Sequence, residues 1–397
     1  MTTASEARSI IRASVQPVGT VTVSLADSLG RILAEDIIAG EDIPPFNNSA
    51  MDGFALRAGD VAQAPHTLDL IGEVAAGSVA RKPVSHGQAM AIMTGAPIPE
   101  GADAVVQQEW TEPSGDARVT VLRPVEPGHN VRAAGADISK GALVLAAGRR
   151  LRPQEAGALA SLGKRFIPVY RPPAVAILAT GDEIVPVESS IGKGQIRNSN
   201  AEMLAALVRE NGGEPALLGI AKDDRADLTR KISQGLASDM LVTTGGVSVG
   251  KFDLVIGVLK ELGVDIKFWK VNIKPGMPLV FGCHGTKPVF GLPGNPVSTM
   301  VTFLEFVKPA LRKLSGSRET GSLVVRAVLE HDIAKTDGKR HFVRGVVRMN
   351  DNRWTVRSAG SQVSNVLTSL VNANCLIVLP EDTERIRAGE EVEIELL

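Results

Sequence analysis

The chain has 397 residues, of which 44% are apolar, and its formal net charge at pH 7 is −1. A chain of this length exceeds what one compact core can bury, so we expect about two to four domains. The near-neutral charge creates no field that would attract nucleic acid or an anionic membrane, and an aromatic content of 4% argues against base-stacking platforms. An anionic substrate must then be held by local groups.

Cysteine usage and apolar run lengths predict a soluble protein of the cytoplasm. Cys283 and Cys375 lie far apart without a C-x-x-C motif, and the six histidines show no metal-ligand spacing. No apolar run approaches the roughly 18 residues of a membrane span, and the N-terminal stretch has no apolar core of signal length. We therefore expect no membrane contact.

The first 171 residues combine helical patterns with a β domain. Apolar residues recur at helical spacing over 6–15, over 24–34 with Ser24 as N-cap, and over 153–162. The β domain would be inserted into an extended, helical N-terminal domain. Its strands are predicted in valine- and glycine-rich segments at 68–77, 88–99, 102–110 and 117–125.

Several polar residues of this β domain lack an obvious packing role. The segment EDIPPFNNSAMDGFAL, residues 41–56, is expected to be irregular, and its Asp52 is either a turn former or a site residue. Thr94 ends an apolar strand next to a glycine. The loop 130–137 could bind an oxyanion, or its arginine could pair with Asp137.

From residue 172 to about 315, strands alternate with helices. This alternation predicts a mostly parallel, doubly wound sheet that binds ligands at the carboxyl ends of its strands. The predicted strands are 174–180, 215–220, 240–246 and 288–294, and the predicted helices are 200–210, 225–235, 252–262 and 296–314.

A glycine-rich loop follows the third of these strands, in the stretch DMLVTTGGVSVGKFD. Gly245, Gly246 and Gly250 would let backbone N–H groups turn inward around an anion, and Ser248 favours such a cradle. An ordinary tight turn has a similar local sequence. The spacing matches neither G-x-G-x-x-G nor a Walker loop, so the cradle would be another kind of phosphate site.

Acidic residues follow three successive strands. Asp182 and Glu183 follow the first strand, Asp223 and Asp224 the second, and Asp253 the glycine loop of the third. The carboxyl ends of parallel strands meet at one edge, and clustered carboxylates repel one another unless a hard cation binds them. Although one acid could simply cap a helix, we interpret the set as a Mg²⁺ site that bridges to a phosphate.

Cationic and amide groups come from two later segments. Lys270 and Lys274, in FWKVNIKPGMP, would share one face of a strand, although solvated lysines would have the same pattern. In GLPGNPVS, which contains Pro293, a strand leads into a helix with Asn295 as N-cap and Pro296 at the first helical position. The free N–H groups of that helix predict a second anion site.

Together these motifs resemble the molybdopterin molybdotransferase family, which includes bacterial MoeA and the E domains of gephyrin and of its plant counterpart. One departure is Met277, where the family pattern leads us to expect lysine. The resemblance covers nearly the whole chain in the family's order and is carried by PPFNNSAMDGFA, MTGAPIPEGADAVVQQE, NVRAAGADI, TGDE, TTGGVSVGKFD, KPGMP and GLPGNPVS.

The resemblance implies a multi-domain α/β fold in an elongated homodimer. Short alternating strands in the last 75 or so residues independently support a C-terminal β-barrel. The implied domains are an extended helical N-terminal domain (1–42 and 143–171), an inserted β-rich domain (43–142), a central doubly wound, MoaB/MogA-like molybdopterin-binding domain (172–316) and the barrel (317–397).

The resemblance also implies an activity, in which molybdate-derived molybdenum is inserted into adenylylated molybdopterin and AMP is released. The catalytic residues carried over by motif are Asp52, Thr94, Asp137, Glu183 and Lys274. The substrate-binding residues are Gly245, Gly246, Ser248, Lys270, Pro293, Asn295, Pro296 and Ser364. The Mg²⁺ ligands are Asp182, Glu183, Asp224 and Asp253.

Partners and alternatives follow from the same resemblance. Each active site is expected to be shared between two chains of the homodimer. The resemblance also allows for contacts with the adenylyltransferase and with maturation factors of molybdoenzymes.

Three alternative functions are an adenylyltransferase with the same central fold, a nucleotide pyrophosphatase with that fold, and a gephyrin-like scaffold. The DGFA and TGAP motifs belong to the β domain. They argue against the adenylyltransferase and the pyrophosphatase, because proteins with only the central fold lack that domain.

Overall fold

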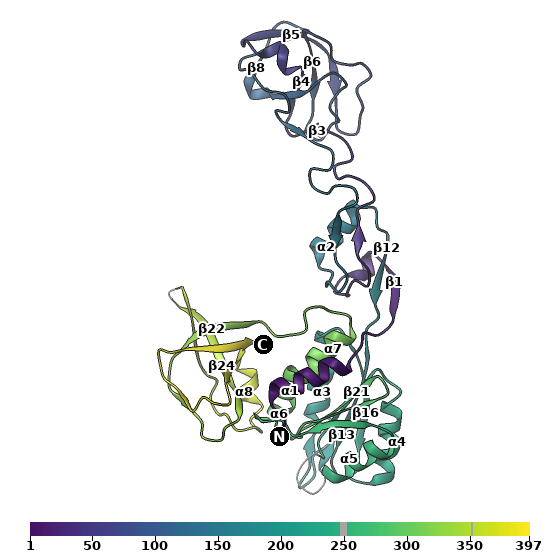
Figure 1. Cartoon of the computed structure of the whole chain (residues 1–397), viewed down its shortest axis with the longest axis vertical. Coiled ribbons are helices and arrows are strands. Elements are labelled where there is room, and N and C mark those ends of the chain that lie inside the picture. Colours follow the sequence, from purple (N-terminus) through teal and green to yellow (C-terminus); the bar gives the residue numbers. More distant parts are fainter. Residues whose placement is uncertain (247–251, 351) are drawn as a thin grey trace. The chain divides into compact units, whose positions relative to one another are not determined.

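The chain folds into two compact units in the computed structural model, which describes residues 1–246, 252–350 and 352–397, apart from the side chains of Phe252 and Asp253 (Figure 1). The first unit comprises Met1–Ala34, Gly148–Leu151 and Ile167–Leu397, and the second comprises Glu35–Ala147 and Arg152–Phe166. These units are coarser than the four expected domains, whose boundaries stay a prediction. None of the helices in the described residues has the length and apolar character needed to span a membrane.

A six-stranded sheet forms the centre of the first unit, in the order β16-β13-β17-β21-β20-β18. The first four strands are parallel and the last two pair antiparallel, which confirms the mostly parallel sheet expected from the sequence. The strands are β16 (Glu214–Ala221), β13 (Ala174–Thr180), β17 (Met240–Thr244), β21 (Lys287–Leu292), β20 (Val280–His284) and β18 (Asp265–Trp269).

Helices cover both faces of the sheet because its strands are apolar on both. In β13, Val175 and Ile177 belong to one core cluster, whereas Ala176 and Leu178 belong to the other. The first cluster is covered by α1 (Ala4–Ser14), α3 (Ser199–Glu210) and the helical segment 296–314, and the second by α4 (Arg225–Gly235) and α5 (Phe252–Glu261).

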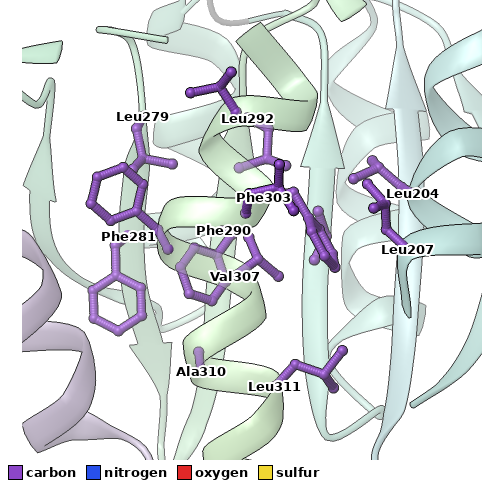
Figure 2. Packing of buried hydrophobic residues seen from close by; sticks show 14 of the residues in the cluster. Leu204, Leu207, Leu279, Phe281, Phe290, Leu292, Phe303, Val307, Ala310 and Leu311 are labelled. Atoms are coloured by element: carbon purple, nitrogen blue, oxygen red, sulfur yellow. The ribbon is translucent and has the colours of Figure 1, made fainter. Parts of the chain in front are cut away.

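The helical segment 296–314 fills the larger core. It consists of α6 (Pro296–Thr302), the π-helical turn η4 (Phe303–Val307) and α7 (Lys308–Leu314). Figure 2 shows Phe303 and Val307 in one cluster with Phe281 and Phe290 of the sheet, whose ring centroids lie 5.0 Å apart. This packing fixes the segment across the sheet.

The N-terminal helix α1 is fastened to the same unit. Its N-terminus carries a capping box, in which Thr3 and Glu6 satisfy each other's backbone N–H groups. Ala7 and Ile11 of α1 are buried in the larger core. Just before the helix, Thr2 bridges to Val271 and accepts a hydrogen bond from the N–H of Asn272.

A closed five-stranded barrel forms the C-terminal part of the first unit, as expected. Its strands follow the order β24-β25-β22-β28-β26, and pairing of β26 with β24 closes the ring. The short strand β19 (Ile273–Lys274) adds in parallel to β24 and joins the barrel to the central domain. The barrel strands are β22 (Val324–Leu329), β24 (Arg340–Asn350), β25 (Arg353–Ser358), β26 (Cys375–Leu379) and β28 (Glu391–Leu396).

The second unit contains the β domain. Its six-stranded sheet has the order β7-β4-β6-β5-β9-β8 and includes all four segments predicted as strands. Helix α2 (Pro153–Ser161) also belongs to this unit and begins with proline, as predicted. The strands of the sheet are β4 (Gly53–Leu56), β5 (His66–Val74), β6 (Gln88–Ile92), β7 (Ala104–Gln107), β8 (Thr111–Pro113) and β9 (Arg118–Val121).

Short elements complete both units. The paired strands are β1 (Thr20–Ser24) with β12 (Phe166–Tyr170), β2 (Ile37–Ile38) with β11 (Leu143–Leu145), β3 (Asn48–Ser49) with β10 (Val131–Arg132), β14 (Ile184–Val185) with β15 (Ile196–Arg197), and β23 (Ile333–Ala334) with β27 (Arg385–Ile386). The short helices are η1 (Ala26–Ser28), η2 (Ala58–Val61), η3 (Gln108–Trp110) and α8 (Thr368–Val371).

Three local predictions were wrong. Residues 24–34 form no α-helix, because the chain leaves strand β1 at Ser24 and makes only the 3-10 turn η1. The segment 41–56 is not wholly irregular, since Gly53–Leu56 form the strand β4 between β6 and β7. Lys270 and Lys274 do not share one strand, because Lys270 has a left-handed backbone (φ 73°) that separates β18 from β19.

Candidate functional site

A large cleft opens at the carboxyl edge of the central sheet, where the barrel faces it. The cleft has a volume of about 1520 Å³ and lies entirely within the first unit. One wall comes from the ends of β13, β17 and β21 with the loops that follow them, and the other from β19 and the barrel. A site at the strand ends agrees with the general rule for open α/β sheets.

The glycine loop begins at this edge and admits no side chain at its first two positions. Gly245 has φ +92° and Gly246 has φ +66°. A Cβ on Gly245 would lie 2.3 Å from the carbonyl oxygen of Thr180, and one on Gly246 would lie 2.6 Å from the Thr180 hydroxyl. Both glycines line the cleft, whereas Ser248 and Gly250 fall outside the described residues.

Side-chain hydrogen bonds lock the loop after β21 to the end of β17. Asn200 donates to the Thr244 hydroxyl at 3.1 Å and to the carbonyl of Gly294 at 2.8 Å. Thr244 in turn donates to the carbonyl of Pro293 at 3.0 Å. Asn295 and Pro296 follow as the N-cap and first residue of α6, as predicted, and both line the cleft.

Ser364 reaches the same loop from the barrel side. Its hydroxyl accepts a hydrogen bond of 2.9 Å from the Asn295 amide. The loop that carries Ser364 is held by Arg344, which is 1% exposed and donates to the carbonyls of Ser361 and Val363. Burial lowers the pKa of Arg344. The structure thus brings Ser364 to the residues that the sequence grouped with it.

Lys274 lies in the second wall with a carboxylate behind it. Its ammonium lies 3.4 Å from Asp337, which also accepts a hydrogen bond of 2.8 Å from Nε2 of His341. Although burial raises the pKa of Asp337, hydrogen bonds from His341 and Lys339 bring it to about 2. Burial lowers the pKa of His341, so that its ring is neutral at pH 7. Lys270 is exposed and does not line the cleft.

The predicted metal ligands are only partly gathered. Glu183 lines the cleft, while Asp182 accepts a hydrogen bond of 3.1 Å from the N–H of Asp223. Asp224 caps α4 by accepting from the N–H of Asp227, and the side chain of Asp253 is outside the described residues. Among the side chains that the structure describes, no three His, Cys, Asp or Glu residues form a metal-binding group.

The carboxylate oxygens of these residues are nevertheless of the ligand type that Mg²⁺ prefers. Mg²⁺ prefers oxygen ligands and commonly takes one or two carboxylates from the protein, with phosphate and water completing the shell. Glu183 at the cleft edge, with Asp182 next to it in sequence, meets that requirement. A cluster of three carboxylates is not needed.

Asp52 and Thr94 lie together in the second unit. Asp52 accepts hydrogen bonds from the Thr94 N–H at 2.7 Å and from its hydroxyl at 3.0 Å. These two bonds, the backbone one first, lower the pKa of Asp52. Asp137 is exposed, and its N–H donates to the carbonyl of Ile43. Asp52 is therefore an oriented, exposed carboxylate rather than only a turn former.

Sequence reasoning missed most of the barrel wall. His331, His341, Arg344 and Gln362 line the cleft, but in the sequence they are isolated polar residues of strands and loops. Only Ser364 was expected there, and only from the resemblance. The pairing of β19 with β24 places this wall opposite the strand ends, and no local pattern signals that pairing.

Three family models match the chain in order. They are the MoeA N-terminal region (domains I and II) over residues 2–163, a probable molybdopterin binding domain over 176–313, and the MoeA C-terminal region (domain IV) over 326–397. The matched regions together span most of the chain and include both walls of the cleft.

Relatives match over nearly their whole length. The molybdopterin molybdenumtransferase of Bacillus subtilis is 38% identical over 386 residues, which cover 95% of this chain and 90% of that protein. The protein of the same name from Haemophilus influenzae is 38% identical and covers 96% of this chain and 94% of its own. The crystal structure of the molybdopterin biosynthesis MoeA protein from Pyrococcus horikoshii OT3 matches with a TM-score of 0.88 at 37% identity, covering 100% of both chains.

The glycine loop generates a stability prediction. Gly245→Ala is expected to cost about 1–3 kcal/mol of unfolding free energy, because the new Cβ meets a backbone oxygen and the left-handed φ strains alanine. Gly257→Ala within α5 is the matched control, since the nearest atom to its Cβ is 3.7 Å away, and it should be neutral or stabilise by up to about 1 kcal/mol. Urea titrations measure both. A Gly245→Ala protein as stable as the control would contradict the observed loop geometry.

Proposed function

The chain belongs to the MoeA family and acts in molybdenum cofactor biosynthesis, and on that premise we propose that it inserts molybdate-derived molybdenum into adenylylated molybdopterin and releases AMP. The observation that carries the proposal is the two-walled cleft at the strand ends. The adenylyltransferase alternative is set aside, because the N-terminal and C-terminal MoeA models match in addition to the central one.

The cleft residues suit a reaction that depends on positioning and charge neutralisation. Gly246, Gly294 and Asn295 line the cleft, and their backbone N–H groups are proposed to donate to phosphate oxygens, with Gly294 held through its carbonyl by Asn200. Lys274 supplies a positive charge from the opposite wall. Asp337 holds this ammonium in place until an anion binds.

Magnesium dependence is a further part of the proposal. Bound Mg²⁺ would screen the phosphate charge during cleavage of the phosphoanhydride. Glu183, Asp182 and Asp253 are the residues proposed to hold it. Asp224 can join them as a ligand only if its carboxylate releases the N–H of Asp227, which it now caps at the start of α4.

We propose that the working form is a homodimer in which each site combines groups from two chains. The support is the distribution of the expected site residues: Asp52, Thr94 and Asp137 belong to one compact unit, and the cleft belongs to the other. A two-fold axis repeats every contact, so one chain's β domain can complete its partner's cleft. Contacts with the adenylyltransferase and with maturation factors of molybdoenzymes would bring substrate in and carry product away.

Lys274→Gln tests the proposed reaction. Loss of this charge should weaken binding of adenylylated molybdopterin about 10-fold at low salt, because hydrogen bonds to charged groups are worth about 1.5–3 kcal/mol. AMP release with molybdate should fall accordingly. Lys267→Gln is the control, since it removes an equal charge from β18 outside the cleft. Equal affinity in the two variants would refute the anion-binding role of Lys274.

Glu183→Gln tests the magnesium site. The Mg²⁺ concentration that gives half-maximal AMP release should rise on the order of 10-fold, since one anionic ligand is lost. Glu188→Gln, an exposed residue of the following loop, should leave it unchanged. AMP release that is insensitive to EDTA in the unmodified protein would rule the metal out.

Subunit exchange tests the shared site. Asp52→Ala and Glu183→Ala proteins are mixed under conditions that exchange subunits and are assayed at a Mg²⁺ concentration at which each is inactive alone. In a mixed dimer one site then carries both defects and the other neither, so random exchange should restore roughly a quarter of the unmodified activity. If sites lie within single chains, every site keeps a defect and no activity returns. Tag pull-down must show that mixed dimers formed.

A further inference from the structure

A buried acid at the π-helical turn connects three parts of the first unit. The side chain of Glu305 in η4 is 0% exposed, and Arg8 of α1 donates to its Oε2. The same guanidinium lies 3.7 Å from Glu395 Oε1 of β28, whose side chain is 13% exposed. The N-terminal helix, the central domain and the barrel thus meet at these three side chains. None of them lines the substrate cleft.

The two acids share one arginine, which leaves an oxygen without a donor. Glu305 Oε1 is buried and has no hydrogen-bond partner among the described residues. A buried carboxylate oxygen in that state carries its full desolvation penalty. A proton on Glu305 removes the penalty, because the carboxyl group then donates to Glu395 while Oε2 still accepts from Arg8.

The other cations near the pair hydrogen-bond to other groups, although the charges of Glu395 and Glu305 also act on Lys308. Lys308 of α7 directs its ammonium to the hydroxyl of Ser322 at 3.3 Å, and Arg312 binds Asn211 and the carbonyl of Gly321. Lys313 donates to the carbonyl of Arg12. The charged groups on the surrounding elements are Arg8 and Arg12 of α1, Lys308, Arg312 and Lys313 of α7, Glu395 of β28 and Glu210 of α3.

The electrostatics agree with the geometry. Burial, and after it the charge of Glu395, raise the pKa of Glu305 from 4.5 to about 8, although Arg8 opposes the shift. Glu305 therefore keeps its proton at neutral pH. A cavity of about 270 Å³ beside the pair is lined by Arg8, Glu305 and Glu395.

We propose that a protonated Glu305, which donates to Glu395 and accepts from Arg8, forms a pH-sensitive latch that fastens α1 and the barrel to the central domain. Loss of the proton leaves two negative charges against one arginine in a buried site. The latch then loosens, and the three elements separate more readily.

The direction of the pH effect follows from proton uptake on folding. Between the ordinary glutamate value of 4.5 and about 8, the folded chain holds a proton on Glu305 that the unfolded chain has lost. Stability contributed by the latch is therefore complete below about 4.5, falls as pH rises, and is gone above about 8.

The latch is connected to the cleft by one covalent route and by one backbone hydrogen-bonded route. The turn η4 continues directly from α6, whose Pro296 and Ser298 line the cleft. The residues before α1 bridge to Val271, three positions before Lys274 in the opposite wall. Loosening the latch therefore reaches both walls. The π-helical geometry supports a special role for this turn, since such turns occur often at functional sites.

The test replaces Glu305 by a side chain that cannot ionise. Glu305→Gln keeps an acceptor for Arg8 and an N–H donor for Glu395, so it reproduces the protonated latch at every pH. Hydrogen exchange of α1 and of residues 391–396 is compared between the unmodified protein and the variant at the same pH, which cancels intrinsic exchange. The ratio of their rates, unmodified protein over variant, should rise by up to about 10-fold per pH unit between pH 5 and pH 8 and level off above about 8, where the contribution of the latch is already lost.

Two further variants keep the outcome decisive. Glu393→Gln removes an exposed charge from the same strand and should exchange like the unmodified protein. In Glu395→Gln, the new amide N–H can donate to the carboxylate of Glu305, so the pH dependence of exchange should be weaker. This variant tests the latch even if Glu305→Gln does not fold. A ratio that stays constant between pH 5 and pH 9 for both latch variants, or equal behaviour of Glu393→Gln and the latch variants, would overturn the proposal.

Discussion

The packing of helical segment 296–314 against the central sheet is the constraint on which the cleft and the junction with the barrel both depend. Phe303 and Val307 lock the middle of the segment into the largest core (Figure 2). Its first residues are then fixed at the carboxyl edge of the sheet, where Pro296 lines the cleft. Because interiors are close-packed, the segment cannot shift at one end without disturbing the other.

The secondary structure was predictable where each element carries its own pattern. In the four parallel strands and in the helices between them, apolar residues recur at regular spacing along the sequence. Turn residues separate these elements. The expectation failed at residues 24–34, where Ile32 bridges to Arg150 and Leu33 to Val169, more than 110 positions later. Such a partner is invisible to a local pattern, so tertiary pairing overrode the helical spacing.

The candidate site was predictable on one side only. Gly245, Gly246 and Asn295 were recognisable because a loop between a strand and a helix needs special backbone geometry. His341 and Arg344 have ordinary places in a barrel strand, and they reach the cleft only because β19 pairs with β24. Of the predicted acids, Glu183 lines the cleft, whereas Asp182 and Asp224 are engaged by backbone N–H groups. Hydrogen bonds of that kind depend on the folded loop, which composition does not specify.

The buried acid pair also gives a reason for a glutamate at position 305, which stability alone does not require. Glu305 occupies a helical face whose neighbours Leu304 and Phe306 are apolar, and an apolar residue there could be as stable as a buried ion pair. With an ionisable group at this position, the stability of the contact between α1, the barrel and the central domain depends on protonation. An apolar residue would not make it so. Because the cleft is built from the same central domain and barrel that this junction joins, the rigidity of the site becomes a property of the whole unit rather than of its lining residues.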